Sequence, residues 1–129
     1  GTVTGVQTCA LPISGTPRRE FLHVDDLAAA VVFALERWQP GPGELQYLNV
    51  GSGSDITIAE AAALVAEAVG YRGAIRWDPS RPDGTPRKLL DGSRLAALGW
   101  RASIPLRPGL EQTVADYIGR RQSGTEVRL

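Results

Sequence analysis

The residues best suited to binding chemistry lie in one loop, Arg81 to Lys88, with the sequence RPDGTPRK. Two prolines and a glycine stiffen and bend this loop. Arg81, Arg87 and Lys88 supply the guanidinium and ammonium donors that bind a diphosphate. Asp83 is the lone acid of the loop and can accept hydrogen bonds from sugar hydroxyls. The same composition also suits an ordinary charged surface turn, so the loop by itself leaves both interpretations open.

A glycine-rich turn, Gly51-Ser52-Gly53, stands between an expected strand and an expected helix, where dinucleotide-binding turns are found. The third glycine of that pattern would fall at position 56, which is Ile56. The pattern therefore fails. We expect a tight turn that needs small residues, and no cofactor-binding residue at this place.

The only histidine, His23, is followed closely by two carboxylates, Asp25 and Asp26. A histidine beside a carboxylate can act as a general base. A structural histidine is the commoner case, and adjacent acids at a helix start more often serve as cap and dipole partner. We therefore expect a structural His23, Asp25 as the N-cap, no catalytic residue and no metal site.

An alternating pattern of strands and helices must position these residues. Strands are predicted at 19–23, 46–50 and 74–77, and helices at about 25–38, 57–69, 93–98 and 108–120. Thr57 and Glu60 fit a capping box, Ser93 is the expected cap of the third helix, and Gly70 and Gly99 are expected helix stops. The helix from residue 25 is apolar nearly all round, which predicts burial on more than one side. The order predicts an α/β fold, but so few strands indicate one end of a larger domain.

Charge and length limit the function classes. The 129 residues suit one domain, and 14 acidic residues balance 14 basic ones. Seven bases and three acids fall between positions 72 and 101, so this segment can face an anionic ligand, although a mixed solvated surface is the simpler interpretation. Nothing suggests a nucleic-acid arm or a membrane-surface patch, and no apolar run reaches the roughly 20 residues that span a bilayer.

Three segments together resemble one known family: GTPRREFLHVDDLA (15–28), YLNVGSGSDITIAEAA (47–62) and WDPSRPDGTPRKLLD (77–91). They are similar to the C-terminal third of the GDP-L-fucose synthase family, extended short-chain dehydrogenases/reductases of the NAD-dependent epimerase/dehydratase group. REFLHVDD is shared by many sugar-nucleotide enzymes, whereas PDGTPRKLLD is specific to this family. The resemblance implies an α/β fold, namely the C-terminal part of an extended Rossmann-type domain with its substrate-binding subdomain and an incomplete sheet.

The resemblance also implies a function. Such enzymes use NADP(H) to epimerise GDP-4-dehydro-6-deoxy-D-mannose and reduce it to GDP-L-fucose. Arg19 and Asp83 correspond to substrate-binding residues, while Lys88 and Arg87 are weaker candidates for binding the diphosphate or for holding the loop. The family's cofactor and catalytic residues would lie upstream, so we expect none here and no activity from this chain alone. The implied enzyme is bacterial and cytoplasmic, binds a GDP-sugar and can form a homodimer.

The first 13 residues differ from the rest because they carry no charge. Val3 to Ile13, VTGVQTCALPI, matches the in-frame translation of a common sequencing-library adapter. We therefore interpret 1–13 as a non-native segment without strand character, 14–121 as the substrate-binding portion and 122–129 as a tail. Cys9, the only cysteine, then says nothing about redox compartment. The alternative is a real N-terminal strand.

Two other functions remain open at this level. One is a fragment of another sugar-nucleotide dehydratase or epimerase, against which the PDGTPRK loop argues. The other is a stand-alone GDP-sugar-binding module, which the absence of methionine disfavours.

Overall fold

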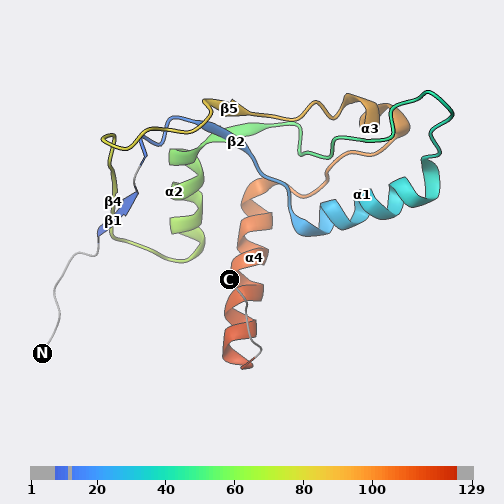
Figure 1. Cartoon of the computed structure of the whole chain (residues 1–129). Helices are drawn as coiled ribbons and strands as arrows, with labels where there is room; N and C mark the ends of the chain where they lie inside the picture. The colour runs from blue at the N-terminus through green and yellow to red at the C-terminus, as the bar shows by residue number, and fades with distance from the viewer. Residues whose placement is uncertain (1–7, 12, 125–129) are drawn as a thin grey trace, which may run out of the picture.

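The computed structural model describes residues 8–11 and 13–124 (Figure 1). Its elements in chain order are β1 (Thr8–Leu11), β2 (Arg18–Glu20), α1 (Val24–Arg37), β3 (Asp55–Thr57), α2 (Ile58–Ala68), β4 (Ala74–Trp77), β5 (Arg87–Lys88), α3 (Ser93–Leu98) and α4 (Leu106–Gln122). This alternation of short strands and helices confirms the predicted α/β class with an incomplete sheet.

The described strands form two small sheets. In one, β1 pairs in parallel with β4, and in the other the strand order is β3-β2-β5. The central strand β2 is antiparallel to β3 and parallel to β5. Figure 1 shows α2 and α4 side by side beneath this second sheet. The second sheet therefore joins the REFLH segment to the far end of the 81–88 loop.

The strand β1 corrects one prediction, because it lies in the segment expected to have no strand character. Thr8 to Leu11 pair in register with Ala74 to Trp77, and the carbonyl of Leu11 also accepts a hydrogen bond from the amide of Asp78 at 2.8 Å. Backbone pairing needs an open row of amides and carbonyls on a neighbouring segment. It does not require an alternating pattern of side chains. The origin of residues 1–13 stays an interpretation.

The strand predicted at Gln46 to Val50 is also wrong, since no described strand pairs with this segment. The carbonyl of Tyr47 instead accepts a hydrogen bond from Nη1 of Arg94 at 2.8 Å. The apolar composition of 46–50 is typical of a buried strand, but a strand also needs a neighbouring backbone in register.

The helix α2 forms as predicted. Thr57 and Glu60 make a complete capping box, and Gly70 ends the helix region at a φ of +71°. The amides of the first two helical residues find further acceptors, because the carbonyls of Pro17 and Gly15 each accept one of them at 2.9 Å. These bonds fix α2 against the chain that leads into β2.

The caps of α1 and α3 differ from the predicted ones. His23, not Asp25, is the N-cap of α1, and its Nδ1 accepts from the amide of Asp25 at 3.1 Å. The N-cap of α3 is Gly92, and the amide of Ser93 donates to the carboxylate of Asp91. A side chain caps whichever amide it can reach, and ring nitrogens and preceding carboxylates are as competent as the expected residues.

His23 has the structural role expected of it. Its side chain is 9% exposed, and a Cβ added at Gly109 in α4 would lie 3.1 Å from its ring. The histidine thus caps one helix while packing against another.

Asp26 joins α1 to the start of α4. Its side chain accepts hydrogen bonds from the amides of Ser103 and Ile104 and from the hydroxyl of Ser103, at 2.9–3.1 Å. The residue is only 3% exposed. Burial on its own would raise the pKa of Asp26, but the hydrogen bonds from Ile104 and Ser103 outweigh it and hold the pKa below its ordinary value.

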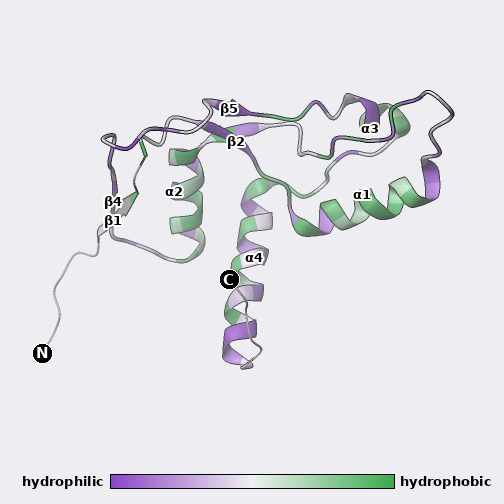
Figure 2. Ribbon diagram, viewed as in Figure 1, coloured by the Kyte–Doolittle hydropathy of each residue, from purple (hydrophilic) through white to green (hydrophobic). Residues whose placement is uncertain are grey.

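The outer surface of α1 corrects the prediction that this helix is buried on more than one side. Its exposed large apolar residues are Val24, Leu27, Val31, Val32 and Leu35. Figure 2 shows this helix as a largely apolar ribbon at the edge of the molecule. Composition measures the tendency to be buried, whereas burial itself needs a covering surface, and no described residue covers this one. Within the described ranges, no helix has the length and apolar character needed to cross a bilayer.

Replacing Asp26 by Asn should loosen the junction between α1 and α4. Hydrogen bonds to a charged acceptor are worth about 1.5–3 kcal/mol each, and a neutral amide loses this advantage. The amides of Ser103 and Ile104 should then exchange with solvent about tenfold faster or more in a hydrogen-exchange NMR measurement. The control is Asp25→Asn, because the Asp25 side chain is 76% exposed and should leave both rates almost unchanged. Equal rates in the two variants would mean that the Asp26 carboxylate does not hold this junction.

The same junction should depend on pH with a defined sign. The folded pKa of Asp26 lies below the ordinary value of about 3.9, so its contribution is fully present above that value and is lost as pH falls through the folded pKa. Amide protection at Ser103 and Ile104, corrected for intrinsic exchange, should be constant from about pH 7 to 5 and fall below about pH 4. A fall well above about pH 5 would mean that another group controls the junction.

Candidate functional site

Four basic residues lie side by side in two pairs where β2 and β5 form their ladder. In the parallel register Arg18 lies beside Arg87, and Arg19 lies beside Lys88. Successive side chains of a strand point to opposite faces of a sheet. Arg18 and Arg87 therefore share one face, and Arg19 and Lys88 share the other.

On the first face both guanidinium groups bind one carboxylate. Nε of Arg18 donates to Oδ1 of Asp55 at 2.9 Å, and Nε of Arg87 donates to Oδ2 at 2.5 Å. The Asp55 side chain is only 4% exposed. The hydrogen bond from Arg87, together with that from Arg18 and the two positive charges, holds the pKa of Asp55 below its ordinary value despite burial. Arg87 thus links the end of the 81–88 loop to β3.

On the second face, neither Arg19 nor Lys88 pairs with an acidic side chain of the described residues. Arg19 donates from Nη1 to the carbonyl of Arg18 at 2.6 Å, and its Nη2 would lie 3.5 Å from a Cβ added at Gly84. Lys88 is exposed. Two neighbouring uncompensated cations favour an anionic ligand.

Asp83 precedes Gly84 in the loop, and its carboxylate is bound to Ser14. Its Oδ2 accepts from the hydroxyl of Ser14 at 2.5 Å, and its Oδ1 accepts from the Ser14 amide at 2.9 Å. These bonds, that of the hydroxyl first, hold the pKa of Asp83 below its ordinary value. The carboxylate is ionised at neutral pH and already accepts one hydroxyl, the kind of donor that a sugar presents.

The glycine-rich turn does not fit a dinucleotide. Oε1 of Glu20 accepts from the amide of Gly53 at 2.8 Å, and a Cβ added at Gly51 would overlap this carboxylate. A phosphate cradle offers its amides to an anionic ligand, whereas here the protein's own carboxylate uses one of them. Gly53 also has a φ of +84°. The prediction of a tight turn that needs small residues is therefore confirmed, with Glu20 as the physical reason.

Glu20 is one of the residues that sequence reasoning missed, together with Arg18 and Asp55. Its other oxygen, Oε2, accepts from the amide of Leu90 at 3.0 Å, so one side chain joins β2, the turn and the chain after β5. The only signal in the sequence is an acid directly after two arginines in a short strand, and that signal does not name its partners.

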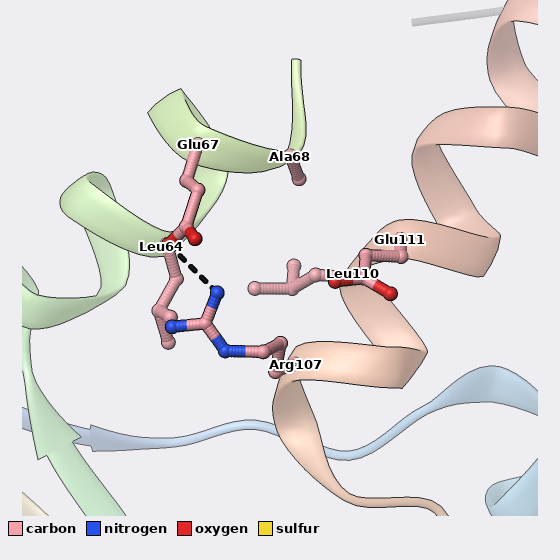
Figure 3. Close-up of a pocket in the computed structure, with 6 residues that line it drawn as sticks. All are labelled: Leu64, Glu67, Ala68, Arg107, Leu110 and Glu111. Atoms are coloured by element: carbon pink, nitrogen blue, oxygen red, sulfur yellow. Dashed lines mark ion pairs between the residues drawn. The ribbon is translucent and has the colours of Figure 1, made fainter. Parts of the chain in front are cut away.

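Hollows outside this region include three, of which one of about 220 Å³ lies between Phe21, Ile56 and the chain at 102–106. The largest of the three, about 800 Å³, is lined by the glycine-rich turn, by 89–93, by α3 and by Trp100 to Ala102. Figure 3 shows a smaller one of about 160 Å³ between α2 and α4, across which Arg107 and Glu67 form an ion pair at 2.7 Å. None of the three includes Arg19, Asp83 or Lys88. Within the described ranges no cluster of histidine, cysteine and acidic residues could hold a metal ion.

Comparison with known proteins finds one matching family model and several similar proteins. The model of the NAD dependent epimerase/dehydratase family matches residues 2–51. The chain is 50% identical over 116 residues to GDP-L-fucose synthase 1 of Arabidopsis thaliana, covering 90% of this chain and 35% of that protein. A GDP-6-OMe-4-keto-L-xylo-heptose reductase from C. jejuni superposes with a TM-score of 0.80 at 30% identity, covering 88% of this chain and 34% of that one. A GDP-mannoheptose C4 reductase from Campylobacter jejuni, solved with NADP bound, gives 0.76 at 30% identity, covering 87% and 35%. The chain spans about a third of the length of the curated relatives it matches.

Proposed function

We propose that this chain, a homologue of the GDP-L-fucose synthases, is the GDP-sugar-binding portion of an enzyme that converts GDP-4-dehydro-6-deoxy-D-mannose into GDP-L-fucose. The identity of 50% over most of the chain supports the substrate class. The PDGTPRK loop supports the same family over other sugar-nucleotide dehydratases and epimerases.

The observation that carries the proposal is the pair Arg19 and Lys88, which lie side by side in β2 and β5 and form no ion pair among the described residues. A GDP-sugar presents a diphosphate and several hydroxyls. The planar donors of Arg19 and the ammonium of Lys88 suit the diphosphate, and Asp83 suits a hydroxyl. Arg87 acts on the other face through Asp55 and supports the loop.

The whole enzyme would use NADP(H), which supplies hydride to the keto-sugar. A relative of similar fold was solved with NADP bound. The glycine-rich turn of this chain does not fit a dinucleotide, so we propose that the cofactor-binding and catalytic residues lie outside it. The role of this chain is to bind and orient the GDP-sugar.

The same proposal includes the division of the chain into segments and the setting of the enzyme. Residues 14–121 form the substrate-binding portion, 1–13 are not native, and 122–129 are a tail. The enzyme is bacterial and cytoplasmic and assembles as a homodimer. A stand-alone GDP-sugar-binding module is the second candidate. It is favoured because this chain carries the proposed binding residues but its glycine-rich turn does not fit a dinucleotide.

GDP binding tests the site directly. In isothermal titration calorimetry of the whole chain, Arg19→Ala should weaken GDP binding about tenfold or more, because a charge-assisted hydrogen bond is worth about 1.5–3 kcal/mol. Asp83→Asn should reduce the preference for GDP over 2′-deoxy-GDP if its hydroxyl ligand is the ribose. The control is Arg72→Ala, which removes an equal charge from an exposed position outside the loop and should leave affinity nearly unchanged. Loss of the same size in both arginine variants would refute the proposed site.

An activity measurement tests whether this chain binds the sugar nucleotide without catalysing hydride transfer. With GDP-4-dehydro-6-deoxy-D-mannose and NADPH, this chain should consume no NADPH, because hydride transfer requires the nicotinamide to be held against the substrate. Absorbance at the NADPH band follows the reaction, with full-length GDP-L-fucose synthase 1 of Arabidopsis thaliana as the positive control. Steady NADPH consumption that depends on the sugar nucleotide would show that the chain holds a cofactor site of its own.

A further inference from the structure

The buried carboxylate of Asp55 lies between two arginines from different parts of the chain. Arg18 belongs to the central strand β2 and Arg87 to the edge strand β5, while Asp55 begins β3 on the opposite edge. The backbone carbonyl of Asp55 also accepts from Nη2 of Arg18 at 2.9 Å. We call these three residues the Asp55 clamp.

The strand β5 is short, and the other contacts near it include its ladder with β2 and the bond from the amide of Leu90 to Glu20. It is two residues long, and the chain before it is tied to β2 by a hydrogen bond from the amide of Arg18 to the carbonyl of Pro86 at 2.8 Å. Like charges directly opposite one another on neighbouring strands repel, and β5 places Arg87 opposite Arg18 and Lys88 opposite Arg19. A shared carboxylate removes this repulsion on one face only.

We infer that Asp55 is a positioning residue for the ligand site: by binding Arg18 and Arg87 on one face of the β3-β2-β5 sheet, it sets Arg19 and Lys88 side by side on the other face as the place for a diphosphate. This inference rests on the proposed function for the identity of the ligand. The clamp itself rests on the contacts of Asp55 alone.

Positioning and simple electrostatics predict opposite results. Asp55→Asn removes a negative charge close to the site, so electrostatics alone would make an anion such as GDP bind more tightly. Loss of positioning would instead let β5 leave its register and weaken GDP binding. We expect binding about fivefold weaker or more in calorimetry, the size typical of a lost coupling between neighbouring groups.

A double-mutant cycle with Arg87→Gln tests whether Asp55 affects GDP binding through its contact with Arg87. If Asp55 acts through Arg87, the double variant should bind GDP no more weakly than Arg87→Gln alone. Asp55→Glu should restore part of the affinity because it keeps the charge, and Asp25→Asn serves as the control for removing an exposed acid. Additive losses, or tighter binding by Asp55→Asn, would overturn the inference.

A second measurement does not depend on GDP. Cross-strand NMR contacts between β2 and β5 should be present in the wild-type chain and lost in Asp55→Asn, while helix α2 keeps its circular dichroism. If those contacts survive in Asp55→Asn, the inference is wrong whatever GDP does. If they are lost but the wild-type chain does not bind GDP, the clamp stands and the proposed function fails.

Discussion

Two guanidinium groups that are distant in the sequence share the carboxylate of Asp55, and the arrangement of the second sheet depends on this contact. A carboxylate that is 4% exposed loses most of its hydration, and two charge-assisted hydrogen bonds are needed to offset that loss. Because Asp55 also begins β3, its position sets where the capping box at Thr57 starts α2. One ionic contact thus connects the loop, the sheet and the helix that follows it.

Similar contacts replace a large apolar core in the described part of the chain. Leu95 is the only large apolar side chain there that is buried. Carboxylates instead join segments far apart in sequence: Glu20 joins the glycine-rich turn to Leu90, Asp26 joins α1 to α4, and Asp83 holds Ser14. Each of these hydrogen bonds fixes the relative orientation of two segments but contributes little hydrophobic free energy. The apolar face of α1 remains uncovered by any described residue, which agrees with a chain that spans about a third of its relatives.

The division of the basic residues has a functional consequence. In composition, Arg19, Arg87 and Lys88 are equivalent candidates for an anionic ligand. In the structure, Arg87 pairs with Asp55, whereas Arg19 and Lys88 lie on the opposite face and form no ion pair among the described residues. Strand alternation thus places the cations that bind Asp55 and the cations proposed to bind the ligand on opposite faces, within a span of two residues.

Much of the local structure followed from the sequence. Helical periodicity located α1 to α4, the pairing of Thr57 with Glu60 predicted the capping box, and Gly70 and Gly99 end their helices at positive φ as expected. These features depend on atoms a few residues apart, so neighbouring residue types are sufficient to determine them. The three segments that resemble the GDP-L-fucose synthase family also agree with the relatives found, one of which is 50% identical over 116 residues.

Other features were decided only by the tertiary structure. The sequence predicted a strand at 46–50 and none at Thr8 to Leu11, and both predictions are wrong because a strand exists only where another backbone stands in register. The partners of Glu20 and Asp26 lie 33 to 78 positions away, beyond the reach of any local pattern. By itself, the sequence determined the helices, the helix stops and the resemblance to the relatives. The fold decided which basic residues pair with a buried carboxylate and which do not, because that choice depends on contacts between residues that meet only when the chain is folded.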